Sequence, residues 1–123
     1  MTDEERLERG REAFKDIHGD VLTLPGKIDP ESFHGHVMRN VYNDVWGRKK
    51  MSNRERRLVV LGALAAQSLE FPLETHLKCA LELGELNASD VEEMMYVLGV
   101  YVGMPRTAVF SQIFQKVSAK PAK

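Results

Sequence analysis

Cysteine is nearly absent from this 123-residue chain, which contains only Cys79. One cysteine excludes an intramolecular disulfide, a CxxC redox pair and a cysteine-rich metal cluster. Such usage is typical of a reducing compartment, and we expect the protein in the cytoplasm. Cys79 itself has two interpretations. It is either a small buried hydrophobe or a thiol paired with His76, three residues before it.

Long apolar runs and an excess of one charge are also missing. The first residues, MTDEERLERGRE, lack the apolar core of a signal peptide, and no stretch approaches the roughly 20 apolar residues of a membrane span. The formal net charge of -1 offers no electrostatic basis for binding nucleic acid or an anionic membrane. We therefore expect neither partner.

The common motifs of metal, nucleotide and serine-hydrolase sites do not occur either. HExxH, an EF-hand loop, GxGxxG, a P-loop and GxSxG are all absent. His34 and His36 are two residues apart, which on a helix places them on different faces. We expect no metal and no cofactor.

What the chain does contain is a nearly continuous apolar repeat at spacings of three and four, the period of amphipathic helices. It predicts an all-α fold of about six helices. A second independent core needs roughly 50 residues of its own, so we expect one domain over residues 1–123. Residues 1–28 form its N-terminal helix and connection, and residues 119–123 a frayed tail. The predicted helices cover about 3–18, 30–46, 53–66, 72–83, 90–102 and 105–117.

Local signals mark the helix ends. Asp29 before Pro30 is typical of an N-cap followed by a first-turn proline. Ser52 with Glu55, and Ser89 with Glu92, fit capping boxes. The third helix is apolar on nearly every side, which predicts a central buried helix.

His76 is the strongest candidate for chemistry, because imidazole titrates near neutral pH and can act as a general acid or base. It lies between Leu73, Leu77 and Ala80 on the helix expected after Pro72. A structural or surface histidine is the alternative. Only the surrounding residues can decide between them.

Charged residues near His76 in the predicted fold have two interpretations each. Glu70, Glu74 and Glu93 are carboxylates that could orient the imidazole, or solvated glutamates. A basic cluster at the turn into the third helix could clamp a substrate carboxylate, or form a solvated turn or intersubunit ion pairs. The cluster contains Arg48, Lys49, Lys50, Arg54, Arg56 and Arg57.

Several of these residues occur in an order and spacing that is more specific than any one of them. The pattern extends from about Phe33 to Phe114, two-thirds of the chain, and together it resembles the γ-carboxymuconolactone decarboxylase family. Its most specific parts are His-xxx-Ala-xxx-Gly and Tyr-x-Gly-x-Pro. Its members here are Trp46, Gly47, Arg48, Met51, Arg56, Arg57, Leu58, His76, Ala80, Gly84, Asp90, Glu93, Tyr101, Gly103 and Pro105.

The resemblance implies the all-helical fold shared with alkyl hydroperoxidase D-like proteins. Those proteins depend on a CxxC pair shortly before the equivalent of His76. Here that stretch reads Leu69, Glu70, Phe71 and Pro72, so a thiol peroxidase is not expected.

The resemblance further implies a cofactor-free decarboxylase that converts a carboxylated muconolactone to an enol-lactone and CO2 in aromatic (protocatechuate, β-ketoadipate) catabolism. The partner would be a small anionic lactone, and the assembly a homo-oligomer, a trimer or hexamer. His76 would protonate the dienolate carbon or polarise the lactone oxygen, with Glu93 or Glu70 orienting the site. The substrate-binding residues would be Arg48, Arg56, Trp46, Leu73 and Tyr101.

One position departs from the family pattern. Its decarboxylases often carry an acidic residue one turn before the histidine, where this chain has Pro72. Either a nearby glutamate, Glu70 or Glu74, substitutes for it, or the protein is a paralogue with another small-molecule substrate. A non-catalytic oligomeric binding protein is the further alternative.

Overall fold

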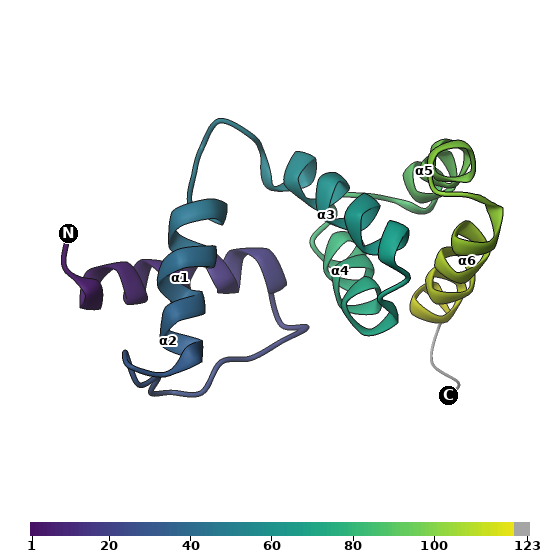
Figure 1. Ribbon diagram of the computed structural model, residues 1–123. Coiled ribbons are helices and arrows are strands. Elements are labelled where there is room, and N and C mark those ends of the chain that lie inside the picture. Colours follow the sequence, from purple (N-terminus) through teal and green to yellow (C-terminus); the bar gives the residue numbers. More distant parts are fainter. Residues whose placement is uncertain (120–123) are drawn as a thin grey trace. The chain divides into compact units, whose positions relative to one another are not determined.

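The computed structural model describes residues 1–119, and within that range all regular structure is helical (Figure 1). The predicted all-α fold of six helices is confirmed. The chain divides into two compact units, one of Met1–Asn53 and one from Arg54 onward. Each unit is described by itself below.

The N-terminal unit pairs α1 (Asp3–His18) with α2 (Phe33–Val37) and its continuation as a π-helix, η1 (Met38–Trp46). α1 covers the predicted range, and Thr2 caps it by accepting a hydrogen bond from the Glu5 N–H. A Cβ on Gly10 would overlap the backbone of Met38, so α1 and η1 cross at a distance that only glycine permits.

The core of this unit is small. It consists of the buried side chains of Leu7, Phe14 and Met38. Beside it, the buried ring of His18 lies 4.4 Å from that of Phe14, and its Nε2 is 2.9 Å from the Tyr42 hydroxyl.

The predicted start of the second helix at Asp29 and Pro30 is wrong. The Asp29 side chain instead accepts from the Glu31 N–H, which closes a turn, and Ser32 caps the helix by accepting from the Gly35 N–H. Asp29 therefore satisfies a turn rather than a helix end. The predicted end at Trp46 and Gly47 is confirmed.

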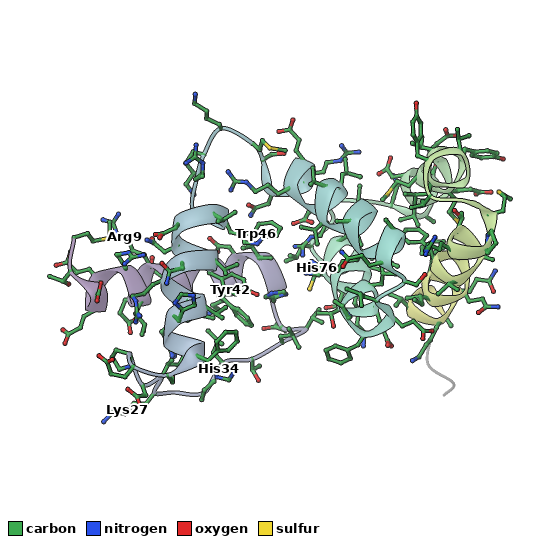
Figure 2. The ribbon with its side chains drawn as sticks, viewed as in Figure 1. Arg9, Lys27, His34, Tyr42, Trp46 and His76 are labelled. Atoms are coloured by element: carbon green, nitrogen blue, oxygen red, sulfur yellow. The ribbon has the colours of Figure 1, made fainter. Side chains whose placement is uncertain are left out.

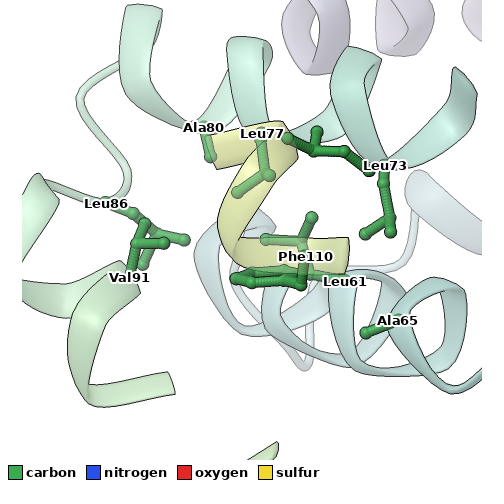
Figure 3. Close-up of a cluster of buried hydrophobic side chains, with 9 residues drawn as sticks. Leu61, Ala65, Leu73, Leu77, Ala80, Leu86, Val91 and Phe110 are labelled. Atoms are coloured by element: carbon green, nitrogen blue, oxygen red, sulfur yellow. The ribbon is translucent and has the colours of Figure 1, made fainter. Parts of the chain in front are cut away.

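The C-terminal unit contains α3 (Asn53–Gln67), α4 (Glu70–Glu82), α5 (Ala88–Tyr101) and α6 (Met104–Ser118). Figure 3 shows Phe110 of α6 among Leu61 of α3 and Leu73 and Leu77 of α4. Burial of these apolar side chains is the main source of stability in this unit. The full buried cluster is Leu61, Ala65, Leu73, Leu77, Ala80, Leu86, Val91, Phe110 and Ile113.

Two details of this unit correct the predictions. α5 is capped by Asn87 and Asp90 in a reciprocal capping box, not by Ser89 and Glu92. α3 is not buried on every side, since its buried residues follow a stripe spaced by four, whereas Val59 is 62% exposed. The helix packs as an ordinary amphipathic one despite its apolar outer face.

The end of α4 and the start of α6 agree with the predictions, whereas α4 begins at Glu70, two residues before the predicted Pro72. α4 ends just before Gly84, whose φ of 70° allows the turn, and Pro105 lies in the first turn of α6. Ala119 caps α6, and the rest of the predicted frayed tail, residues 120–123, lies outside the described residues. Within residues 1–119, each helix is too short or too polar to cross a membrane.

Candidate active site

His76 lies on α4 of the C-terminal unit (Figure 2), and its side chain is partly buried. Its Nδ1 atom lies 2.8 Å from Nη1 of Arg57, a residue of the second turn of α3. A guanidinium can only donate hydrogen bonds, so Arg57 donates and the imidazole nitrogen accepts. The imidazole is therefore bonded directly to a charged side chain of a neighbouring helix.

Arg57 is the largest fully buried side chain of the described residues. Its charge is balanced by Glu85, whose two carboxylate oxygens accept from Nε at 2.8 Å and from Nη2 at 3.2 Å. This bidentate geometry is the strongest form of an arginine–carboxylate pair. Arg57, His76 and Glu85 form one network, called the Arg57 network below.

The turn after α4 places Glu85. Gly84 adopts a positive φ, after which the N–H groups of Glu85 and Leu86 both donate back to the Ala80 carbonyl. This arrangement is typical of a glycine helix end. It returns the chain toward α3, where Arg54 Nε donates to the Glu85 carbonyl at 3.0 Å.

The carboxylates expected beside His76 have other environments. Glu70 is exposed in the first turn of α4, and Glu74 forms an ion pair of 3.1 Å with Lys116 of α6. Glu93 is exposed on α5 and lines a hollow of about 250 Å³ together with Arg54 and Asp90. The carboxylate that joins the network of His76 is Glu85 instead.

The residues expected to bind substrate are dispersed. Leu73 is fully buried in the core, and Tyr101 at the end of α5 is 86% exposed. Arg56 is partly exposed on α3. Trp46 and Arg48 belong to the N-terminal unit, so their place near His76 stays a prediction.

The sequence interpretation missed Glu85, and it treated Arg57 as a member of the basic cluster and of the family pattern but not as a partner of His76. A signal for Arg57 existed, because it precedes Leu61 and Ala65 at steps of four and therefore shares their buried face. Glu85 had no such signal. Its role depends on the turn at Gly84.

Cys79 lies on the buried side of α4 and is fully buried. Burial raises the pKa of its thiol, and the nearby Arg57 charge opposes this only in part. A thiol that stays protonated is a poor nucleophile. The structural interpretation of Cys79 is therefore favoured over thiol chemistry.

No three histidine, cysteine or carboxylate side chains within residues 1–119 are grouped to hold a metal ion. Among the described residues of this site, the imidazole of His76 is the group that can both form hydrogen bonds and transfer a proton near neutral pH.

Comparison with known proteins identifies the family of the chain. The chain is similar over its full length to a 4-carboxymuconolactone decarboxylase of Acinetobacter baylyi (strain ATCC 33305 / BD413 / ADP1), with 24% identity over 131 residues that cover 97% of that protein. Residues 30–116 match the model of the carboxymuconolactone decarboxylase family, and this match includes the whole Arg57 network. The chain therefore belongs to the carboxymuconolactone decarboxylase family.

Proposed function

We propose that the protein is a decarboxylase that acts without a cofactor on a small cyclic anion such as γ-carboxymuconolactone, releasing CO2 and an enol-lactone in aromatic catabolism. The observation that carries the proposal is the Arg57 network, which presents a partly buried imidazole against a fully buried arginine that is paired with a mostly buried carboxylate. Family membership supports the same reaction class.

The chemistry needs little from the protein. In such a lactone the departing carboxylate is conjugated to the lactone carbonyl, so loss of CO2 leaves an electron pair delocalised onto the carbonyl oxygen. An N–H aimed at that oxygen stabilises the charge as it develops. His76 would supply this N–H, either by polarising the lactone oxygen or by delivering the proton to the carbon.

Other residues would hold the substrate. Arg48 and Arg56 are guanidinium groups suited to a carboxylate, and Trp46 and Tyr101 would form apolar walls. Glu93 or Glu70 would orient the pocket. Because Leu73 is fully buried, it would support the pocket from the core rather than touch the substrate.

Pro72 stands where family decarboxylases often carry an acidic residue, so another carboxylate would have to take that role. Pro72 lies in the first turn of α4, and Glu74 is already paired with Lys116. Glu85 is the carboxylate that the network uses, through Arg57. A paralogue with another small cyclic substrate is the second candidate, and this changed acidic partner favours it.

The direct test is turnover. Purified protein is incubated with γ-carboxymuconolactone while CO2 and enol-lactone are followed, and His76→Ala is expected to lower kcat by about 10²–10⁴-fold. His34→Ala, which removes an exposed histidine of α2, is the matched control and should retain full activity. Absence of turnover in the wild type would remove the named reaction, and unchanged turnover in His76→Ala would remove His76 from it.

We also propose that the protein is a homo-oligomer, a trimer or hexamer. Large apolar side chains are exposed along α5 and the start of α6, beside a hollow of about 500 Å³. Contiguous apolar surface of this kind marks interaction sites. The exposed side chains are Tyr96, Val97, Val100, Tyr101 and Met104.

Light scattering tests the assembly. Val100→Glu is expected to shift the particle toward the monomer mass, because it buries a charge in the contact. Val59→Glu, at a valine of α3 that is 62% exposed against 78% for Val100, should not. A wild-type mass equal to that of one chain would contradict the proposal. A stable oligomer without turnover would favour a non-catalytic binding role.

A further inference from the structure

We propose that Arg57 and Glu85 are positioning residues that hold His76 as the neutral imidazole with its proton on Nε2, so that Nε2–H is the group offered to the substrate. This inference rests on the proposed function and adds which nitrogen acts and what fixes it. It follows from the contacts of three side chains.

The first step concerns hydrogen-bond direction. Nη1 of Arg57 lies 2.8 Å from Nδ1 of His76, and a guanidinium carries donors only. Nδ1 must therefore present its lone pair. A neutral imidazole has one ring proton, and with Nδ1 accepting, that proton is on Nε2.

The second step concerns why the arginine cannot turn away. Its Nε and Nη2 groups are both bound to the carboxylate of Glu85, and its side chain is fully buried. The backbone of Glu85 is held in turn by the hydrogen bond from Arg54. The planar guanidinium thus bridges the carboxylate and the imidazole with one fixed orientation.

The third step concerns charge. A proton on Nδ1 would point at the guanidinium N–H, and protonation of both ring nitrogens would in addition place a second cation beside it. Glu85 balances the charge of the guanidinium, so a neutral imidazole adds no net charge to these three side chains. This is the protonation state in which a histidine donates a hydrogen bond to an oxyanion rather than acting as an imidazolium acid.

The consequence for the reaction is a division of roles. The bond from the ring carbon to the carboxylate breaks and CO2 leaves. The electron pair of that bond moves onto the lactone carbonyl oxygen, which accepts the hydrogen bond from Nε2–H. The proton that finally bonds to carbon comes from a solvent water, and the hydroxide left behind takes up a proton from the buffer. His76 keeps its proton throughout, and Arg57 never touches the substrate.

The test is ¹⁵N NMR of the histidine ring in the full-length protein near neutral pH, which distinguishes a protonated from an unprotonated ring nitrogen and needs no substrate. In the wild type we expect His76 to show an unprotonated Nδ1 and a protonated Nε2. Lys116→Met is the matched control, because it removes the cation paired with Glu74 of the same helix, and it should leave this spectrum unchanged.

Removing the contact between Arg57 and His76 requires a variant that still folds. Arg57→Met alone leaves Glu85 without its bidentate partner, so the double variant Arg57→Met, Glu85→Met is used, since replacing a whole buried ion pair by apolar groups is tolerated. We expect its His76 signals to show a mixture of tautomers and imidazolium. With γ-carboxymuconolactone, kcat should fall by about 10²-fold with a smaller change in KM. Glu85→Gln, which keeps an oxygen for Arg57, should keep the Nε2–H tautomer.

The outcomes separate the two proposals. A wild-type spectrum with Nδ1 protonated, or one that the double variant does not change, overturns the inference whatever the activity. A spectrum as expected, in a protein that does not turn over the lactone, keeps the positioning role and overturns the decarboxylase instead.

Discussion

Each unit of the chain contains a histidine bonded to a side chain of another helix, and the two partners differ. In the N-terminal unit His18 meets the hydroxyl of Tyr42 at 2.9 Å, and in the C-terminal unit His76 meets the guanidinium of Arg57 at 2.8 Å. A hydroxyl can donate or accept, whereas a guanidinium can only donate. The first contact leaves the histidine tautomer open, and the second determines it.

The environments of the two histidines also differ, since one is apolar and the other contains a charged pair. His18 is packed against the rings of Phe14 and Tyr42 and is 2% exposed, which is the environment of a structural histidine. His76 is partly buried and is bonded to a fully buried arginine, whose carboxylate partner Glu85 is only 12% exposed. A charged anchor of this kind costs desolvation energy, so it is more informative about function than about stability.

The largest expected effect comes from removing Glu85, the carboxylate that pairs with Arg57. Glu85→Ala leaves the guanidinium of Arg57 buried without its carboxylate, and we expect the free energy of unfolding to fall by about 3–5 kcal/mol. Urea denaturation measures the loss, and hydrogen exchange of the α3 and α4 amides locates it. Asp44→Ala, which breaks the exposed Arg6–Asp44 pair of the N-terminal unit, is the control and should change little. Equal effects of the two variants would contradict the contrast between the units.

A smaller loss is expected at the crossing of α1 and η1. Gly10→Ala pushes a methyl group into the Met38 backbone and should destabilise the N-terminal unit by about 1–3 kcal/mol. Gly62 of α3 has no atom within 4 Å of an added Cβ, so Gly62→Ala should stabilise by about 1 kcal/mol through helix propensity. Thermal denaturation measures both variants, and the changes in stability relative to the wild type must have opposite signs.

The neutral histidine contact is expected to contribute less than the charged one. Tyr42→Phe keeps the ring that packs on Phe14 and removes the hydroxyl facing His18, so unfolding should become easier by about 0.5–1.5 kcal/mol. Chemical denaturation compares it directly with Glu85→Ala. A loss as large as that of the glutamate variant would show that the two histidine contacts are equivalent.

The smallest expected effect is a pH dependence at Cys79. Burial raises the pKa of its thiol above the ordinary 9.0, so the folded state holds the proton more tightly than the unfolded state. The corresponding stability is complete below pH 9.0 and is lost as the pH rises from there through the folded pKa. Denaturation midpoints on either side of that value should fall more in the wild type than in Cys79→Ala. Equal falls of the midpoint in the wild type and in Cys79→Ala would show that the thiol is solvated, and would contradict its raised pKa.

Much of the fold could be predicted because apolar periodicity and helix punctuation are local. The range of α1, the ends at Trp46 and Gly84, and the start at Pro105 were all readable from spacing, glycine and proline. The errors lay where two local signals compete. Asp29 closes a turn rather than a helix, and Asn87 caps α5 in place of Ser89.

By itself the sequence determined the all-helical class, the family pattern and the candidacy of His76, since these depend on residue type and spacing along one chain. The tertiary structure decided the partners of that histidine. Arg57 and Glu85 are 28 residues apart and meet only because α3 packs beside the turn after α4. The burial of this pair, and the contact in which the guanidinium can only donate, arise from the packing of the helices. They assign the ring proton of His76, which spacing along the sequence could not do.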